Sequence, residues 1–468
     1  MGIIKIASVL VAVLTISVST FAQNLQFCAP DKVRALALSG GGAKGAFEVG
    51  ALWHLVRHRK CDFHDISGVS VGALNGAILA QAPRASDPQE SLANISLAIE
   101  KLRSFWLDLR GDEDVYTRRF LGTLGFVLFS RKSMYDSSPL KDKLTHAVDP
   151  SEIAAKGRSF RVGIVSMRNG VYYEVQPGTG AASRECRANR NEKFLAAVLA
   201  SASMPVFFPT PFIRNVQDMS SCAKDVSEEE TDEFEPFADG GVSHTTPVPA
   251  YFNQPYFVPR LKFNSIQATR DDGSADLPRH QPPIHELFVL LASPYSPKTA
   301  NPPGSGQHIK NLPGGTGLLA VTVERVLTAP WRWDMNYALM ANGLLTWKDN
   351  VLGEVEDNLR TASADTQEIL GPIRDHLLPP PGLLNAETSF PVGSANVDGQ
   401  NIPHHYSLYY AAFNREGIDI DTLKFDPALI AKAIKSGCDQ QNRALVENGW
   451  QDMGEQCADV LPAAAQDH

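Results

Sequence analysis

Apolar positions in the first third of the chain repeat one pattern twice: a short apolar run, a glycine-rich turn and an apolar stripe at helical spacing. The first run covers residues 33–38, and the stripe after its glycines covers 49–56. The second run ends at Val69, and its stripe covers 71–79. A short apolar run indicates a buried strand, whereas spacing of three and four residues indicates a helix. The sequence thus predicts two successive units of strand, turn and helix.

Further elements are predicted downstream of these two units. A mostly helical pattern covers residues 85–150. Apolar runs at 160–166 and 171–175 flank Arg168, Asn169 and Gly170, which is typical of a hairpin. Later predictions are a small-residue helix at 194–202, strands at 286–291 and 406–413, one or two helices at 318–345 broken near Pro330, and a helix that Asp426 caps and Pro427 opens.

The segments between these elements have the composition of loops, which indicates how the domain is organised. Residues 294–317 and 379–403 are rich in Pro and Gly, and residues 225–235 contain seven acids, which is typical of a solvated loop. A chain of 468 residues with 43% hydrophobic residues can bury one large core. We expect one α/β domain over residues 23–468, with insertions and a C-terminal helical extension.

Residues 120–129 form an unusually dense apolar patch with basic residues on both sides. One interpretation is a lid or interfacial loop that meets lipid, which would give peripheral contact with a membrane surface. The other interpretation, a helix packed into the core, is favoured for an apolar segment of this length.

The N-terminus and the cysteines predict the compartment. Residues 1–22 have a lone Lys5, an apolar core too short to span a membrane, and small residues before Ala22, as in a signal peptide that is cleaved there. We expect a periplasmic or secreted protein. All six cysteines follow this segment, and an even number in an exported chain favours disulfides over metal ligation or free buried thiols. Sequence order suggests Cys28–Cys61, Cys186–Cys222 and Cys438–Cys457, although six cysteines allow many other pairings.

Charge excludes one class of partner. The formal net charge is -9, which argues against nucleic-acid binding. Neither a cofactor motif nor a zinc or calcium constellation is evident among the histidines, cysteines and acids, so we expect no metal and no cofactor. The sequence does not predict an oligomeric state.

The second glycine-framed turn supplies a candidate nucleophile. Gly68 and Gly72 stand two residues on either side of Ser70. Such spacing allows a sharp turn from strand to helix that leaves the serine hydroxyl exposed. Ser70 is therefore the candidate nucleophile of an acyl-transfer reaction.

The first turn, with Gly40, Gly41 and Gly42, supplies candidate hydrogen-bond donors. Their amides could form an oxyanion hole for charge that develops on a carbonyl oxygen. A phosphate-binding loop is a weaker interpretation, because Gly45 follows Lys44 where a Walker A motif has Ser or Thr. A tight structural turn is the remaining alternative.

A third motif, Asp239-Gly240-Gly241, completes an ordered set that resembles the patatin-like phospholipase family. That family joins a glycine loop of the form GGGxKG, here Gly40 to Gly45 with Lys44, to a GxSxG elbow and a later DGG. The resemblance covers residues 33 to about 450. One departure is that His244 and Thr245 stand where the family commonly has asparagines.

The resemblance implies a fold and an activity. The fold would have three layers, with a central, mostly parallel sheet flanked by helices. The activity would be lipid ester hydrolysis of the phospholipase A or lysophospholipase type, by a dyad of Ser70 and Asp239. An exposed aspartate is a poor base near neutral pH, so Asp239 should be partly buried to raise its pKa.

Two alternatives keep the same fold. One is a hydrolase with a triad of Ser70, an acid and a downstream histidine such as His285, His404 or His405. The other is an inactive module that binds lipid. In addition, His244 could orient Asp239 without acting as the base.

Overall fold

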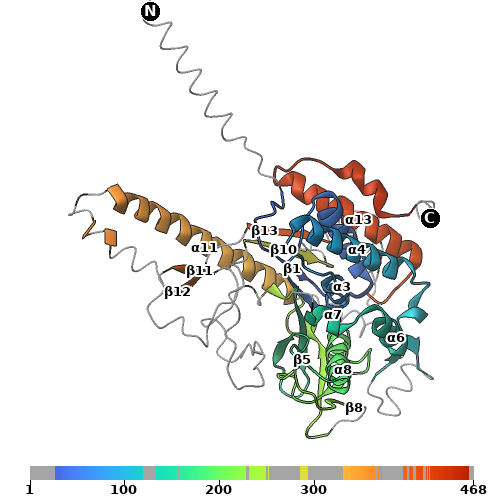
Figure 1. The fold of residues 1–468 in the computed structure, drawn as a ribbon. Coiled ribbons are helices and arrows are strands. Elements are labelled where there is room, and N and C mark those ends of the chain that lie inside the picture. Colours follow the sequence, from blue (N-terminus) through green and yellow to red (C-terminus); the bar gives the residue numbers. More distant parts are fainter. Residues whose placement is uncertain are drawn as a thin grey trace, which may run out of the picture.

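The computed structural model describes residues 27–119, 133–155, 158–227, 231–248, 251, 285–293, 330–361, 363, 367–368, 370–371, 394–397, 400–403, 407–414, 418, 420 and 422–462. A mixed, nine-stranded sheet forms the centre of this part of the chain (Figure 1). Five parallel strands lie in the order β13 (Ser407–Ala412), β10 (Glu286–Leu291), β1 (Arg34–Leu38), β2 (Asp65–Val69) and β5 (Ser159–Ser166). Antiparallel pairing then adds β6 (Tyr172–Val175), β9 (Glu235–Asp239), β7 (Phe212–Ile213) and β8 (Val226–Ser227).

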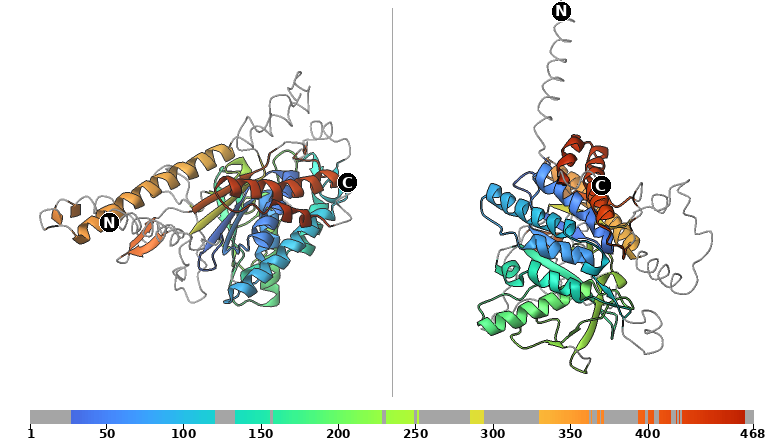
Figure 2. Two further views of the ribbon diagram at one scale, coloured as in Figure 1. Left: turned by 90° about the horizontal axis from the view of Figure 1, so that it is seen from above. Right: turned by 90° about the vertical axis from the view of Figure 1, so that its right-hand side faces the viewer.

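Helices cover both faces of this sheet, which gives three layers (Figures 1 and 2). One face packs against α2 (Gly45–Trp53), η2 (His54–His58), α3 (Val71–Ala80), α4 (Pro88–Leu107), α8 (Arg184–Ser201) and α13 (Pro427–Glu447). The start of α11 (Pro330–Thr361) packs on the other face through Met335 and Ala338. Strands β1 and β2 are buried along their whole length, as expected of parallel strands covered on both sides.

Short elements decorate these layers. They are η1 (Gly42–Lys44), η3 (Asp112–Asp114), β3 (Thr117–Arg118), β4 (Tyr135–Asp136), α6 (Ser138–Ala147), α7 (Pro150–Ala155), η4 (Gly240–Val242), β11 (Ser394–Val397), β12 (Gln400–Pro403) and η7 (Gly454–Val460).

Helices α2 and α13 cross at closely apposed glycines. A Cβ at Gly50 would collide with the carbonyl oxygen of Ile434, and a Cβ at Gly437 would collide with that of Phe47. The last long helix of the chain therefore lies directly on the helix that follows the glycine loop. Both are buried at the crossing, so this contact closes the core around the first strand unit.

The structure confirms the predicted α/β class and most predicted elements. The strands at 33–38, 286–291 and 406–413, the hairpin around Gly170 and the helix capped by Asp426 all form, with Asp426 accepting hydrogen bonds from Ala428 and Leu429. Helix α11 begins at Pro330, where the sequence suggested a break, because proline at a first helical turn loses no intrahelical hydrogen bond. Helix α8 begins at Arg184, ten residues before the predicted start.

The acidic segment departs from its prediction as a solvated loop at Asp225. This residue is buried, and its carboxylate lies 2.7 Å from Nζ of the buried Lys193 and 3.0 Å from Nε of Arg214. A buried charge requires a paired partner, which the sequence pattern alone did not show.

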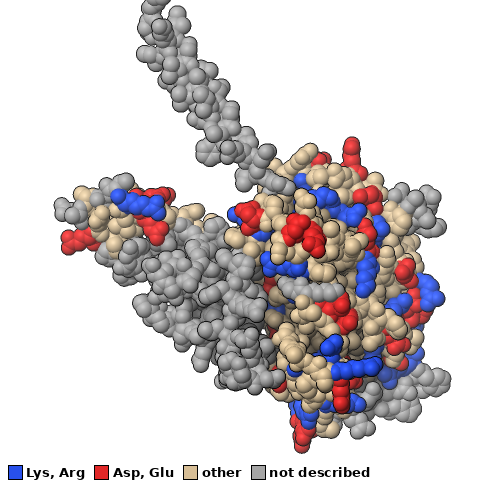
Figure 3. Space-filling model, viewed as in Figure 1, with Lys and Arg blue, Asp and Glu red and all other residues tan. Residues whose placement is uncertain are grey.

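The structure forms three disulfides, Cys28–Cys61, Cys186–Cys222 and Cys438–Cys457, the set that sequence order suggested. Residues 1–22, residues 120–129 and most of the Pro and Gly rich segments lie outside the described residues, so the predictions made for them stay predictions. Among the described helices, none is long and apolar enough to cross a bilayer. Basic and acidic side chains are interspersed over the described surface in Figure 3.

Candidate active site

Ser70 occupies a strained turn between β2 and α3. Its φ of 56° and ψ of -128° lie in a region that residues other than glycine rarely adopt. The turn is held by two hydrogen bonds: the Ser70 N–H donates to Oγ of Ser201 at 2.9 Å, and that hydroxyl donates to the carbonyl of Gly163 at 2.7 Å. Strand β5 and helix α8 thus fix the backbone of the candidate nucleophile.

The two flanking glycines let this turn close. A Cβ at Gly68 would collide with the backbone of Gly72, and a Cβ at Gly72 would collide with the carbonyl of Leu38. Glycine at both positions is therefore a steric requirement of the turn from strand to helix. The elbow predicted from the sequence has the expected geometry.

The glycine loop lies beside Ser70. A Cβ at Gly40 would be 3.1 Å from Cβ of Ser70. A Cβ at Gly41 would be 2.9 Å from the carbonyl oxygen of Ala292, and Gly42 has a positive φ of 58° and lies against the carbonyl of Thr422. The loop therefore requires glycine because backbone from two distant parts of the chain packs onto it.

The three loop amides are not equivalent. The N–H of Gly40 donates to the carbonyl of Thr245 at 2.8 Å, so this amide already has a partner. In the described part of the chain the N–H groups of Gly41 and Gly42 have none, and both residues line the cavity above Ser70. Of the three predicted oxyanion donors, Gly41 and Gly42 are the ones that remain available.

The buried side chain of Lys44 anchors the glycine loop to a distant segment of the chain. It is 2% exposed, and its Nζ donates to Oγ1 of Thr422 at 3.1 Å. The N–H of Ala43 donates to the carbonyl of Thr422 at 2.9 Å. Gly45, the next residue, lies so close to Val71 that a side chain would overlap its methyl groups. The glycine loop is thus tied both to the start of α3 and to the segment before α13.

Asp239 lies at the end of β9, buried next to Ser70. Its Oδ1 accepts a hydrogen bond from the N–H of Gly241 at 2.7 Å. Burial raises the pKa of Asp239 to about 7, and hydrogen bonding from Ser70 and from Gly241 opposes part of this shift. Gly240 leaves no room for a side chain, because a Cβ would be 2.5 Å from the carbonyl of Gly163. The turn after Asp239 thus points the carboxyl group at the serine.

A buried carboxyl group that the sequence did not indicate connects these parts. Oε1 of Glu48 accepts from the N–H of Ser39, and Oε2 accepts from Nδ2 of Asn75, both at 2.9 Å. Asn75 also accepts from Nε1 of Trp106 at 2.8 Å. Burial raises the pKa of Glu48 to about 8, while the bonds from Asn75 and Ser39 oppose the shift. Only a tertiary contact brings Glu48 and Asn75 together, so no local pattern marks them.

An apolar cavity of about 190 Å³ opens above Ser70 and Asp239. Aliphatic and aromatic side chains make up most of its wall, and the described lining residues include no histidine. The main apolar members are Leu74, Phe105, Trp106, Leu109, Val115, Leu140, Met204, Phe207, Phe208 and Phe425. A cavity of this character suits a hydrocarbon chain.

Neither of the candidate histidines that the structure describes lines the cavity above Ser70. His285 accepts a hydrogen bond from the N–H of Val33 at the amino ends of β1 and β10, whereas Ser70 follows the carboxyl end of β2. His244 contacts Oδ1 of Asp334 in α11 at 2.8 Å and does not bond to Asp239. His404 and His405 lie outside the described residues.

These residues have a counterpart among known protein families. Residues 36–251 match the family described as patatin-like phospholipase. This segment belongs to the patatin-like phospholipase family. The match includes the glycine loop, the serine elbow and the aspartate turn, and it confirms the resemblance seen in the sequence. Membership supports a lipid acyl hydrolase in general.

Solved structures of two proteins are similar to the chain at low identity. VipD from Legionella pneumophila matches 90% of this chain and 68% of its own, with 13% identity and a TM-score of 0.29. Human GIVD cytosolic phospholipase A2 matches 58% of this chain and 44% of its own, with 13% identity and a TM-score of 0.23. Among curated protein sequences no match was found.

Proposed function

We propose that the protein hydrolyses the acyl ester of a phospholipid or lysophospholipid with a dyad of Ser70 and Asp239. The observation that supports this most is the pairing of a strained, fixed serine with a buried carboxyl group at the base of an apolar cavity. A patatin-like family match supports the lipid substrate. The apolar wall suits the acyl chain, while the polar head group stays toward solvent.

The reaction runs in two halves. Oγ of Ser70 attacks the ester carbonyl carbon while Asp239 takes the hydroxyl proton, and the N–H groups of Gly41 and Gly42 stabilise the oxyanion. Collapse of the resulting tetrahedral intermediate breaks the ester bond between the carbonyl carbon and the alcohol oxygen. The alcohol leaves with the proton from Asp239. Water then attacks the acyl-serine ester, Asp239 takes and returns a proton as before, and the fatty acid leaves with Ser70 restored.

Export is part of the same proposal. The signal-like pattern of residues 1–22 and three disulfides support a periplasmic or secreted protein, since disulfides persist in oxidising compartments. The apolar cavity is consistent with contact at a membrane surface, from which a lipid would enter.

Hydrolysis of defined substrates by purified protein tests this function. Ser70→Ala and Asp239→Asn should each lower kcat by at least about 10³-fold, and the double variant should lose little more, because the two residues act as one unit. Ser96→Ala, on α4 outside the cavity, is the matched control and should keep full activity. A fluorophosphonate should label Ser70 in the wild type and not in Ser70→Ala.

The same experiment separates the alternatives. Substantial activity in Asp239→Asn, together with loss in a histidine variant such as His285→Gln or His404→Gln, would replace the dyad with a triad. A folded protein that binds phospholipid vesicles but releases no fatty acid and is not labelled would be the inactive lipid-binding module.

A further inference from the structure

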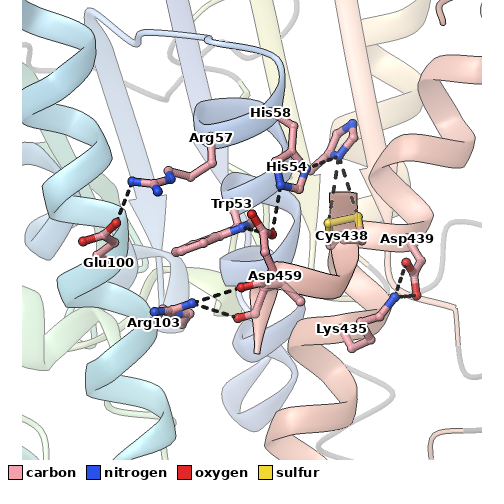
Figure 4. A network of polar contacts seen from close by, with 12 residues as sticks. Trp53, His54, Arg57, His58, Glu100, Arg103, Lys435, Cys438, Asp439 and Asp459 are labelled. Atoms are coloured by element: carbon pink, nitrogen blue, oxygen red, sulfur yellow. Dashed lines mark hydrogen bonds and ion pairs between the residues drawn. A yellow bond between two sulfur atoms is a disulfide. The ribbon is translucent and has the colours of Figure 1, made fainter. Parts of the chain in front are cut away.

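Two histidines and two cysteines meet in the core, far from the cavity above Ser70. His54 and His58 belong to η2, Cys438 to α13 and Cys457 to η7. One ligand atom from each residue lies within 4.8 Å of all the others. All four residues are buried, and both cysteines are 0% exposed. In Figure 4 dashed lines join His54 to the two sulfur atoms of the disulfide, and join His58 to His54 and to Asp459.

The spacing of these atoms is close to that of a tetrahedral metal site. Zinc bonds of about 2.0–2.3 Å place neighbouring ligand atoms roughly 3.3–3.8 Å apart. Here the Nδ1 atoms of His54 and His58 are 3.2 Å apart. Nδ1 of His54 lies 3.9 Å from Sγ of Cys438 and 3.8 Å from Sγ of Cys457. Only the two sulfur atoms, joined as a disulfide, are too close to be separate ligands.

A carboxylate orients one of the imidazoles for this role. Nε2 of His58 donates to Oδ1 of Asp459 at 3.0 Å, because a carboxylate can only accept. The lone pair of His58 is therefore on Nδ1, which faces the cluster. Asp459 is itself held by Nε1 of Trp53 at 2.8 Å (Figure 4). A carboxylate behind a histidine is the usual outer partner of a zinc ligand.

To bind a metal through Nδ1, His54 would have to give up its hydrogen bond with Arg59. Nε of Arg59 donates to its Nε2 at 3.1 Å, so His54 carries its proton on Nδ1, the atom that faces the sulfurs. Coordination through Nδ1 moves this proton to Nε2 and turns the Arg59 Nε away. Arg59 keeps its hydrogen bonds from Nη2 to Asn442 and to the carbonyl of Gln451.

We propose that reduction of the Cys438–Cys457 disulfide converts this cluster into a zinc site with His54, His58, Cys438 and Cys457 as ligands. A dithiol reductant gives two electrons and two protons to the disulfide and is itself oxidised to a disulfide. Binding of Zn²⁺ then releases the two thiol protons, and no further oxidant or reductant is needed.

A polar pocket on the surface leads toward this cluster. Arg57, His58, Lys60, Glu455 and Asp459 are among its lining residues. It gives a hydrated cation access to His58 and borders η7, the short helix that carries Cys457, although neither cysteine lines the pocket. The sequence does not show the site because His54 and Cys438 are 384 residues apart, and no pair of cysteines has the spacing of a zinc motif.

In both redox states the same four residues of η2, α13 and η7 lie together, but the bonds between them differ. The disulfide joins η7 to α13 alone, whereas the metal would add bonds from both to η2. In the zinc form, metal–ligand bonds would therefore take the place of the Cys438–Cys457 disulfide as the link between these elements.

Cobalt binding to the full chain tests the proposal, since tetrahedral Co²⁺ with thiolate ligands has intense visible bands. Oxidised protein should bind no tetrahedral Co²⁺. After anaerobic reduction with a phosphine, the protein should bind one Co²⁺ per chain with a spectrum of two thiolates and two imidazoles, and Zn²⁺ should displace it. Cys186→Ser/Cys222→Ser, which removes a disulfide elsewhere, should behave as the wild type does.

Single substitutions test the role of each residue in metal binding. His58→Asn and Cys457→Ser should abolish the tetrahedral spectrum, while Asp459→Asn should keep its shape and lower the Zn²⁺ affinity about 10- to 100-fold. A reduced protein that stays folded by circular dichroism and shows no tetrahedral Co²⁺ would overturn the proposal. So would a spectrum unaffected by His58→Asn, or an unfolding on reduction that Zn²⁺ does not reverse.

Discussion

At the scale of single residues, the site depends on burial of one carboxyl group. Asp239 is 4% exposed, and burial raises its pKa to about 7. A base is most effective when its pKa lies near the working pH, so this aspartate is suited to accept the Ser70 proton without a histidine. Ser70 supplies the matching constraint, because its positive φ fixes where the hydroxyl can point.

The first prediction concerns the pH dependence of activity. In the proposed dyad Asp239 is a base only when it is ionised, so kcat/KM should rise tenfold per pH unit below about 7 and level off above it. A rate profile on a soluble short-chain ester measures this. A profile already level at pH 5 would contradict the raised pKa.

The second prediction concerns stability. Because the pKa of Asp239 is raised in the folded state, the folded protein binds the proton more tightly than the unfolded chain does. The contribution of Asp239 to the free energy of unfolding is therefore fully present below pH 4 and is lost as the pH rises through about 7. Asp239→Asn should therefore raise the Tm relative to wild type at pH 8 and not at pH 4, as calorimetry would show. An equal effect at both pH values would count against an ionised buried carboxylate.

The third prediction concerns Glu48, which joins Ser39 of the glycine loop to Asn75 of α3. Glu48→Gln places an amide N–H₂ where one carboxyl oxygen accepts, so one of the two bonds is lost. Misplacement of the loop should lower kcat about 10- to 100-fold with little change in KM. Glu90→Gln on the exposed part of α4 is the control. An unchanged kcat in Glu48→Gln would make the pair purely structural.

At the scale of elements, the crossing of α2 and α13 supports the glycine loop. Helix α2 begins at Gly45, directly after the loop, and α13 presses on it at Gly50. Movement of α13 would therefore be transmitted to the amides beside Ser70.

The fourth prediction tests this crossing. Gly50→Ala should destabilise the protein by about 1–3 kcal/mol or more, because its Cβ meets the backbone of α13. Gly353→Ala on α11 meets nothing within 4 Å and should raise stability by up to about 1 kcal/mol through helix propensity. Urea unfolding measures both. Equal stability of the two variants would mean that α13 can withdraw freely from α2.

The elements show what sequence patterns can and cannot predict. The two units of strand, turn and helix were predictable, because periodicity and glycine spacing are local. Ser70 and Asp239 could be nominated for the same reason. The partners Ser201, Glu48 and Thr422 could not, since their contacts arise only when distant segments pack. The exposure of Asp225 was predicted wrongly because its cationic partners, Lys193 and Arg214, are 32 and 11 positions away and meet it only through tertiary packing.

At the scale of the whole molecule, the three disulfides are distributed over the fold, and two of them lie near the ends of its described part. Cys28–Cys61 fixes the segment before β1, and Cys438–Cys457 fixes η7 to α13.

The fifth prediction is that thiol titration of unfolded, non-reduced protein isolated from its native compartment finds close to no free cysteine. Six free thiols would contradict export and would favour the reduced form of the His54 and Cys438 cluster.

The contact between Lys44 and Thr422 has a consequence for biosynthesis. The two residues are 378 positions apart, and the same threonine holds the backbone of Ala43. Translation delivers the serine elbow and the aspartate turn long before Thr422 leaves the ribosome. A nascent chain therefore carries Ser70 and Asp239 while its glycine loop still lacks this anchor, and we expect the proposed activity to appear only once Thr422 has been made and packed.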